Sequence, residues 1–325
     1  MTVLVTGAGG FIGSHLTEAL LNAGREVRAL VHYNSRGSWG HLDDLKTDFG
    51  DRFDVRLGDV TDAFLVRELV DDCETVFHLA ALIAIPYSYQ APASYLSVNV
   101  QGTLNMLEAC KRANVKRIIV TSTSEVYGTA RYIPMDESHP LQAQSPYAAS
   151  KVAADKLAES FYWSYGLPVT ILRPFNTYGP RQSARAVVPT VLTQALSGAR
   201  EIALGNLEPK RDMTFVDDTV RAFLLAAEKP NIEGETIHFG QGNALSIADL
   251  ARMCLRTVDS DARVISLDQR RRPNGSEVEL LTCDHSKAKR LLGWEPKVAL
   301  TDGLRATADY LTAHLLDYRS EVYVL

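Results

Sequence analysis

The chain has 325 residues, and its 34 lysines and arginines against 39 aspartates and glutamates give a formal net charge of −5. With 46% hydrophobic and 22% charged residues, it has the composition of a globular protein that can bury its own core. The mild acidity argues against a nucleic-acid or anionic-membrane partner, because such binders usually carry a basic face. No apolar run reaches the roughly 18 residues of a membrane span, and the first residues lack the features of a signal peptide. The four cysteines are scattered, so we expect no metal site, no disulfide framework and a cytoplasmic location.

The first half of the chain alternates short β-branched runs with longer amphipathic stretches. Strand–helix alternation at this spacing predicts βαβ units, and hence a parallel sheet that is covered by helices on both faces. Each crossover between parallel strands is expected to be right-handed. The predicted strands are 2–6, 26–31, 53–57, 75–79, 117–121 and 169–173, and the predicted helices are 11–23, 98–113 and 147–165.

After Pro174 proline, glycine and arginine recur and the predicted strands become shorter. We therefore expect residues 1–175 to form a first domain and residues 176–325 to form a smaller C-terminal domain over the carboxyl ends of the sheet. The stretch 215–227 is helical and apolar enough to dock back on the first domain. The boundary is thus predicted to be interleaved, with residues 215–240 belonging to the first domain.

A glycine-rich turn, Gly7-Ala8-Gly9-Gly10-Phe11-Ile12-Gly13, follows the first predicted strand and precedes the first predicted helix. Glycine lets the backbone approach a pyrophosphate closely, and a helix N-terminus offers unpaired N–H groups and a positive dipole end. The glycines that fit are Gly7, Gly10 and Gly13, whereas the third glycine of the classical G-x-G-x-x-G pattern would fall on Ile12. The position between a strand and a helix favours a dinucleotide site over an empty turn. The first domain is therefore predicted to be an α/β domain with a parallel sheet that binds a dinucleotide.

The end of the second predicted strand bears on the choice between NAD and NADP. NAD-specific sites usually place a carboxylate there to bind the ribose hydroxyls, but residues 30–36 contain none. Arg36 could pair with the 2′-phosphate of NADP, although it could also be a solvated loop residue. We therefore expect NADP in preference to NAD. Asp59, which follows the third predicted strand, could contact the adenine edge.

A phenol and an ammonium group lie four residues apart on one predicted helix, at Tyr147 and Lys151. They would share one helix face, and the cation would lower the pKa of Tyr147 toward the range of a general base. The spacing is common by chance, but downstream of the glycine loop it indicates a catalytic pair. Thr123 follows the fifth predicted strand at the edge of the sheet where α/β proteins bind ligands. It could share a hydrogen bond with the substrate hydroxyl that Tyr147 deprotonates.

Together these motifs resemble the extended short-chain dehydrogenase/reductase family of nucleotide-sugar enzymes, over essentially the whole chain. The resemblance also rests on His78-Leu79-Ala80-Ala81, Asn99-Val100-Gln101-Gly102-Thr103 and Arg173-Pro174-Phe175-Asn176. It implies a Rossmann-type, doubly wound α/β domain that binds NAD(P), and a smaller C-terminal domain that binds a nucleoside-diphosphate sugar as substrate. It also implies a homodimer in which helices 98–113 and 147–165 form a four-helix bundle. The implied cofactor contacts are Gly7, Gly10, Phe11, Ile12, Gly13, Asn34, Arg36, Asp59, Val60, Leu79, Ala80, Ala81, Asn99, Tyr147 and Lys151.

The resemblance leaves two reactions open, and Glu125 separates them. Family members oxidise the sugar at C4, with Tyr147 accepting the proton of the hydroxyl group. A 4-epimerase then returns the hydride to the other face of C4. A 4,6-dehydratase removes the C5 proton, expels the C6 hydroxyl as water and returns the hydride to C6, which needs a carboxyl group.

Glu125 stands where dehydratases of this family carry a glutamate, although it could instead be a solvated or salt-bridged carboxylate. The order Thr-Ser-Glu resembles the GDP-mannose 4,6-dehydratases, whereas Ser124 departs from the Thr-Asp-Glu of dTDP-glucose dehydratases. One carboxyl group would then have to serve both C5 and C6. The implied catalytic residues are Thr123, Ser124, Glu125, Tyr147 and Lys151.

At closer range the segments 121–130, 144–147 and 178–186 resemble dehydratases of the legionaminic-acid pathway type, which act on a nucleotide-linked N-acetylglucosamine. We therefore expect a 4,6-dehydratase acting on UDP-N-acetylglucosamine, with a 4-epimerase as the alternative. A third possibility is a sensor that binds the nicotinamide nucleotide without turnover, but such a protein needs neither Thr123 nor the Tyr147/Lys151 pair. The implied substrate contacts are Asn176, Val188, Pro189, Arg211, Arg272 and Glu277.

Overall fold

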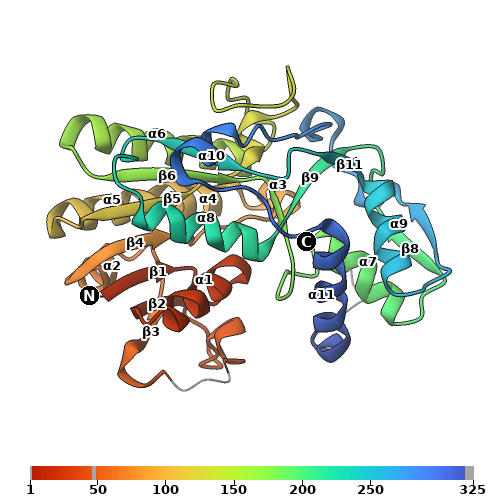
Figure 1. The fold of residues 1–325 in the computed structure, drawn as a ribbon, viewed down its shortest axis with the longest axis horizontal. Coiled ribbons are helices and arrows are strands. Elements are labelled where there is room, and N and C mark those ends of the chain that lie inside the picture. Colours follow the sequence, from red (N-terminus) through yellow and green to blue (C-terminus); the bar gives the residue numbers. More distant parts are fainter. Residues whose placement is uncertain (1, 46–48, 319–325) are drawn as a thin grey trace.

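The computed structural model describes residues 2–45 and 49–318 (Figure 1). Seven parallel strands form its central sheet. The chain first builds the sheet outward from β1 to β3 and then continues on the other side of β1 with β4. The strand order therefore reverses between β1 and β4, and ligands bind at such a switch point in α/β proteins. In spatial order the strands are β10 (Thr236–Phe239), β6 (Val169–Pro174), β5 (Arg117–Thr121), β4 (Cys73–His78), β1 (Thr2–Thr6), β2 (Glu26–His32) and β3 (Phe53–Gly58).

Helices cover both faces of this sheet, because successive side chains of a strand point to opposite sides. Val3 and Val5 of β1 belong to one core cluster with residues of α1 (Phe11–Asn22) and α8 (Val216–Glu228). Leu4, between them, belongs to a second cluster. The predicted Rossmann-type, doubly wound α/β fold is confirmed. The helices that contribute to the second cluster are α2 (Ala63–Val70), α5 (Gly102–Ala113) and α6 (Pro146–Tyr165).

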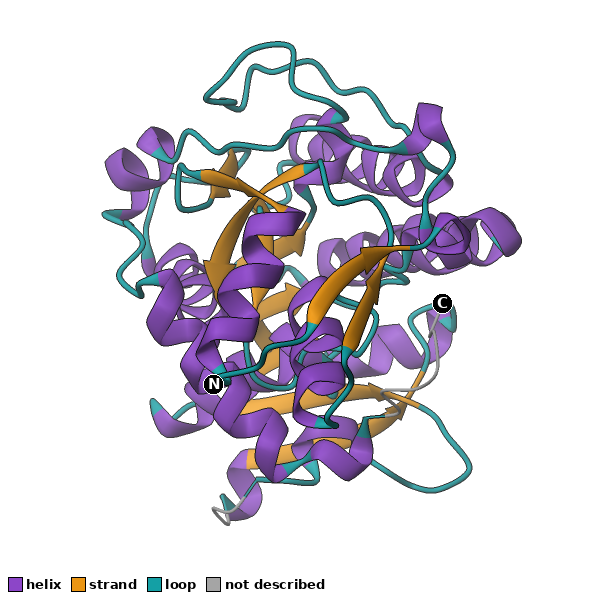
Figure 2. Cartoon of the chain, turned by 90° about the vertical axis from the view of Figure 1, so that its right-hand side faces the viewer, coloured by secondary structure: helices purple, strands orange, loops and turns teal. Residues whose placement is uncertain are grey.

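The C-terminal half adds two small sheets at one end of the molecule, on the right in Figure 1. Figure 2 views the molecule from this end and shows helices around the short strands. One sheet contains β11 (Ala244–Ser246), β9 (Lys210–Phe215) and β7 (Asn176–Tyr178), and the other pairs β12 (Arg263–Ser266) with β8 (Glu201–Leu204). The helices of this half besides α8 are α7 (Val187–Leu196), α9 (Ile247–Thr257), α10 (Ser286–Leu292) and α11 (Leu300–Ala313).

Some elements differ from the prediction. The helix α2 was not expected, because it makes only about two turns and shows little periodicity; the Asp62 carboxylate caps it by accepting from the N–H groups of Phe64 and Leu65. The helix predicted over 98–113 is α-helical only from Gly102 onward, and its first four residues belong to a π-helical segment, Leu96–Gln101. Two further short helices, α3 (Ile85–Gln90) and α4 (Pro92–Tyr95), lead into it. Among the described residues, no helix is both long and apolar enough to cross a bilayer.

Candidate active site

A cavity of about 1230 Å³ lies along the carboxyl ends of the central strands and extends to the C-terminal elements. Segments that follow six of the seven central strands contribute to its wall, as expected for a doubly wound sheet. Most of the predicted site residues line it. They are Gly7, Gly10, Phe11, Ile12, Gly13, Asn34, Arg36, Asp59, Val60, Leu79, Ala80, Ala81, Thr123, Ser124, Glu125, Tyr147, Lys151, Asn176, Arg211, Arg272 and Glu277.

Asn99, one of the predicted cofactor contacts, does not line the cavity. It is buried behind the wall, where its side-chain oxygen accepts a hydrogen bond from the Leu82 N–H at 2.8 Å. Its amide nitrogen donates to the Leu82 carbonyl oxygen at 2.9 Å and to Ser150 Oγ at 2.9 Å. Asn99 therefore holds the lining segment around Leu82 against helix α6 instead of facing the cavity itself.

Val188 and Pro189 also lie outside the lining. Both are buried in helix α7, and Val188 belongs to the main core cluster. Their neighbours Val187 and Thr190 line the cavity instead. Consecutive helix residues point in different directions, so a position read from a motif can miss the lining residue by one.

The glycine loop forms a cradle that only glycines allow. Gly7 adopts a φ of +68°, and the Gly10 N–H donates to the Gly7 carbonyl oxygen at 3.0 Å. A Cβ atom at Gly13 would lie 2.1 Å from the Gly7 carbonyl oxygen. Helix α1 begins here with no side-chain cap and no acidic residue in its first turn, so its free N–H groups remain available for an anion. This cradle fits the pyrophosphate of a dinucleotide.

The residues that follow β2 and β3 are the candidates for binding the ribose of the dinucleotide. Asn34 Oδ1 accepts hydrogen bonds from the N–H groups of Arg36 at 3.1 Å and Ser38 at 3.2 Å, which shapes the loop after β2. The exposed Arg36 side chain lines the cavity and makes no hydrogen bond or ion pair within the described part of the chain. Asp59, which follows β3, pairs with His32 at 3.2 Å.

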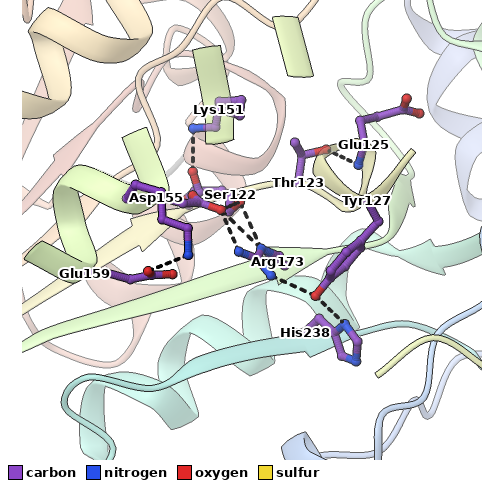
Figure 3. Close-up of polar contacts among 11 residues, drawn as sticks. Ser122, Thr123, Glu125, Tyr127, Lys151, Asp155, Glu159, Arg173 and His238 are labelled. Carbon is purple, nitrogen blue, oxygen red and sulfur yellow. Dashed lines mark hydrogen bonds and ion pairs between the residues drawn. The ribbon is translucent and has the colours of Figure 1, made fainter. Parts of the chain in front are cut away.

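Tyr147, Lys151 and Thr123 all line the cavity near the end of β5, and Figure 3 shows Lys151 and Thr123 there. Helix α6 begins at Pro146, and Ser145 caps it by accepting from the Ala148 N–H, which sets Tyr147 at the start of the helix. The Thr123 side chain is the hydrogen-bonding neighbour that acts to lower the pKa of the Tyr147 hydroxyl. Lys151 lies one turn further along and donates from Nζ to the Thr121 carbonyl oxygen at 2.6 Å.

The pKa of Tyr147 differs from the prediction. Burial raises it above its ordinary value, and the hydrogen bond to Thr123 offsets only part of that rise. The prediction that Lys151 lowers the pKa of Tyr147 is therefore wrong. Lys151 donates its hydrogen bond to a backbone carbonyl oxygen. Burial lowers the pKa of Lys151, and the negative charge of Asp155 opposes this lowering.

Glu125 lies in a 3₁₀ turn, Ser124–Tyr127, directly after Thr123. The Glu125 N–H donates to Thr123 Oγ1 at 3.2 Å, and the residue is only 8% exposed. Within the described ranges, no group hydrogen-bonds to or pairs with its carboxylate, which borders the cavity and in Figure 3 points away from Arg173. The neighbouring Ser124 is also buried. The alternatives of a solvated or salt-bridged Glu125 stay open, because the carboxylate borders the cavity and interacts with the charge of Arg211.

A buried ion pair beneath the site was not identified from the sequence. Asp155, one turn after Lys151 on α6, pairs with Arg173 of β6 at 2.8 Å, and both side chains are almost fully buried. Ser122 Oγ donates to the same carboxylate oxygen at 2.6 Å. Arg173 also donates to the Tyr127 hydroxyl at 2.8 Å (Figure 3). This network joins α6, β6 and the turn that bears Glu125. The sequence placed Asp155 at helical spacing from Lys151 and Arg173 near the end of a strand, but it gave no sign that the two would meet.

The substrate side of the cavity carries two guanidinium groups on one carboxylate. Arg211 and Arg272 lie 3.3 Å and 3.5 Å from Glu277 Oε1, and Arg211 is buried. The side-chain oxygen of Asn176 is buried and accepts no hydrogen bond within the described part of the chain. Two cations and an unused amide match the donors and acceptors that a diphosphate and a ribose need.

The fold and this site define a Rossmann-type protein with a Tyr–Lys pair and a Thr beside a dinucleotide cradle. Residues 4–307 match the family model described as GDP-mannose 4,6 dehydratase, and the chain belongs to that family.

Curated relatives carry two different activities in their names. A dTDP-glucose 4,6-dehydratase of an Actinoplanes species is 33% identical over 319 residues, covering 97% of this chain and 98% of the relative. A UDP-glucose 4-epimerase of Mycolicibacterium smegmatis is 34% identical over 316 residues, covering 95% and 98%. The resemblance to nucleotide-sugar enzymes of the extended short-chain family is confirmed, while the N-acetylglucosamine type stays a prediction.

Solved structures show the same division. The dTDP-glucose 4,6-dehydratase from Streptomyces venezuelae, with NAD and TYD bound, has a TM-score of 0.89 at 30% identity and covers 98% of this chain and 99% of its own. The UDP-glucuronic acid 4-epimerase from Bacillus cereus, in complex with UDP-glucuronic acid and NAD, has a TM-score of 0.89 at 32% identity, covering 97% and 100%. Similarity alone therefore does not choose between dehydration and epimerisation.

Proposed function

We propose that the protein is a nucleotide-sugar 4,6-dehydratase that uses a nicotinamide dinucleotide. The observation that carries this choice is Glu125: its residue is only 8% exposed, yet its carboxylate borders the cavity two residues after Thr123 and makes no hydrogen bond or close ion pair among the described residues. The carboxylate is therefore available to a ligand in the cavity, beside the Tyr–Lys pair. Epimerisation at C4 needs no such group, whereas removal of the C5 proton does.

In this proposal the chain's residues divide the proton transfers. Tyr147 accepts the proton of the C4 hydroxyl, and Thr123 shares the hydrogen bond that orients this hydroxyl. Glu125 takes the C5 proton and then donates a proton to the C6 oxygen, which leaves as water. A bound nicotinamide dinucleotide would take up the C4 hydride and return it to C6 once water has left, so that C4 remains a ketone. The proton held by Tyr147 then passes to C5, which balances the reaction. Arg211, Arg272 and Asn176 bind the diphosphate part of the substrate.

We further propose UDP-N-acetylglucosamine as the substrate, from the resemblance of segments 121–130, 144–147 and 178–186 described above. The test is incubation of the protein with UDP-, GDP-, CDP- and dTDP-linked glucose and N-acetylglucosamine, each with NAD and NADP. Mass spectrometry of the products should show loss of one water and a 4-keto-6-deoxy sugar. Interconversion of C4 epimers without water loss would establish the 4-epimerase in place of the dehydratase.

Replacing Glu125 with Gln sharpens this test, because the amide keeps the size of the side chain but cannot move a proton. The variant should bind substrate and still oxidise C4, so that a reduced nicotinamide signal or a 4-keto sugar with its C6 oxygen accumulates. Formation of the 6-deoxy product should fall at least ~10²-fold. If the variant forms 6-deoxy product at the wild-type rate, Glu125 is not the acid–base group.

The choice of cofactor rests on two opposing observations. The two relatives' structures described above hold NAD, which supports NAD here, whereas the unpaired Arg36 on the cavity wall supports the NADP preference. Fluorescence titration of both cofactors with Arg36→Ala decides between them. If Arg36 binds a 2′-phosphate, the variant weakens NADP far more than NAD, and Arg67→Ala on the exposed face of α2 changes neither. Equal losses for both cofactors would contradict the NADP preference.

The homodimer stays a proposal and rests on the family resemblance. The helices concerned, α5 and α6, pack against each other, and α6 exposes Trp163 (79%) and Tyr165 (58%) near its end. Sedimentation should then give twice the 35.8 kDa of one chain. A species of one chain mass at micromolar concentration would contradict the dimer.

A further inference from the structure

Gln144 is a hydrogen-bonding hub just before the catalytic helix, although it does not line the cavity. Its side-chain oxygen accepts from the Thr129 N–H at 2.5 Å, which ties it to the segment after the Glu125 turn. Its amide nitrogen donates to the carbonyl oxygens of Gly275 and Glu277 at 3.2 and 3.3 Å. Its own carbonyl oxygen accepts from Ser276 Oγ at 2.5 Å. The next residue in the chain caps the helix that carries Tyr147.

Ser276 connects this hub to a second segment. Its hydroxyl lies 2.6 Å from the Tyr89 hydroxyl. Since the single Ser276 proton is directed at Gln144, Tyr89 must be the donor in this second bond. Tyr89 belongs to α3, which packs against Tyr147 through a small cluster that includes Ile85 and Tyr95. One serine hydroxyl thus bridges the two segments that flank Tyr147.

The same serine sits in the loop that carries Arg272 and Glu277, the charged groups on the substrate side of the cavity. This loop has its own internal bonds: the N–H groups of Ser276 and Glu277 donate to the Pro273 carbonyl oxygen at 2.8 and 3.2 Å. The loop can therefore keep its shape without the bond to Tyr89. The bond to Tyr89 connects this loop to helix α3, which packs against Tyr147.

We propose that Ser276 and Tyr89 are positioning residues that couple nucleotide binding to the placement of Tyr147. The inference rests on the proposed function, which gives Tyr147 the proton transfer and the loop the nucleotide. Binding energy from the non-reacting part of a substrate can be used to hold the reacting groups in place. A displacement of about 1 Å at the reacting centre can cost on the order of 10²-fold in rate, so a loosened link should lower kcat more than it weakens binding.

The kinetic test uses Tyr89→Phe, Ser276→Ala and the double variant. Each single variant should lower kcat by roughly 10-fold, while KM and the Kd of UDP stay within about 2-fold of wild type because the loop keeps its internal bonds. The double variant should be no worse than Ser276→Ala, because Tyr89 acts through Ser276. Tyr87→Phe is the matched control: Tyr87 is on the same helix, and its hydroxyl makes no hydrogen bond within the described residues. Unchanged kcat, or a rise in KM alone, would overturn the proposal.

Hydrogen exchange gives a readout that does not depend on the reaction. UDP should slow amide exchange over residues 142–150 in the wild type but not in Ser276→Ala, and Ser276→Thr, which keeps the hydroxyl, should restore the effect. Equal protection in wild type and Ser276→Ala would overturn the link. A wild-type protein that converts no nucleotide sugar but shows the UDP effect would instead refute the proposed function alone. Comparing the Tm values of the variants separates loss of coupling from loss of folding.

Discussion

The protonation state of a single side chain, Tyr147, controls the first proton transfer of the proposed reaction. Its side chain is 7% exposed, and burial raises the pKa of its phenol, so the protonated form dominates at neutral pH in the chain without ligands. A general base must be deprotonated to accept a proton. Raising the pH increases the deprotonated fraction, so the activity of the wild type should increase with pH above neutrality.

Tyr147→Phe tests this role directly. The variant removes the hydroxyl group but keeps the aromatic ring and its edge contact with Tyr95. We expect kcat to fall at least ~10²-fold and the residual rate to lose the pH dependence, while UDP binds as in the wild type. The measurement is a pH series of kcat and kcat/KM for both proteins. A variant with near-normal turnover, or with the wild-type pH profile, would remove Tyr147 from the role of base.

Some residues of the site could be predicted from the sequence and others could not. Thr123, Tyr147 and Lys151 could be predicted because motif and position agree, and the cavity brings them together. The pairing of Asp155 with Arg173 could not, since only the tertiary structure brings a helix residue to the end of β6. The sequence equally does not show that the Glu125 carboxylate makes no hydrogen bond or close ion pair within residues 2–45 and 49–318, because this depends on how all the other elements pack.

At the scale of elements, the glycine loop leaves no room for an added side chain at the contact between Gly7 and Gly13. The strand β1 and the start of α1 are held together where Gly13 meets Gly7, and both groups at the contact are backbone. Backbone cannot rotate away as a flexible side chain can, so the loop must open if a methyl group is added. This local rule was predictable, because the motif, the strand before it and the helix after it are continuous in the sequence.

Gly13→Ala should therefore weaken dinucleotide binding by more than ~10-fold, in line with the 1–3 kcal/mol that overpacking costs, and should lower the Tm. The control is Gly275→Ala, where an added Cβ meets nothing within 4 Å. Cofactor titration and thermal unfolding of both variants check the prediction. Normal cofactor affinity in Gly13→Ala would mean that the pyrophosphate does not sit on this turn.

Other elements were less predictable for physical reasons. The strands of the central sheet are continuous apolar runs, because parallel strands are buried on both faces, and such runs stand out in the sequence. The short helices α2, α3 and α4 span four to eight residues each, which is too short for a clear periodic pattern, and only α2 has a side-chain cap. Segment 85–95, which packs under Tyr147, was therefore absent from the predicted elements.

At the scale of the whole molecule, buried histidines link folding to pH. Burial lowers the pKa of His78 to about 3, and the pKa of both His15 and His238 to about 4. Between these values and 6.5 the unfolded chain binds more protons than the folded one, so stability falls as the pH falls. Asp212 acts in the opposite direction, because burial raises its pKa to about 6 and the folded chain holds that proton. Burial also lowers the pKa of His41 and raises the pKa values of Glu137 and Asp217. Four histidines against three carboxyl groups predict a net loss of stability below about pH 6.5.

Urea unfolding at pH 7.0, 6.0 and 5.0 measures this loss. The His78 ring is bonded to Thr6 Oγ1 and Thr103 Oγ1 at 3.0 and 3.1 Å and cannot gain a second proton without breaking one of them. His78→Gln should have a lower free energy of unfolding at pH 7 but a shallower decline on acidification. His32→Asn, on an exposed side chain, should keep the wild-type slope. A wild-type protein as stable at pH 5 as at pH 7 would contradict the linkage.

The path of the chain through the central sheet limits how this molecule can be recombined. After β6 the chain leaves to build the wall that bears Arg211, and it returns as α8 and β10, which hydrogen-bonds to β6 at the edge of the sheet. A fragment cut at residue 175 would leave β6 as a bare edge and uncover the face under α8, both of which favour aggregation. In chimeras with relatives, a graft of 176–215 together with 241–318 that keeps 216–240 from the recipient should remain soluble. A single crossover at residue 175 should give insoluble protein, because it pairs foreign α8 and β10 residues with a core they did not evolve to fill.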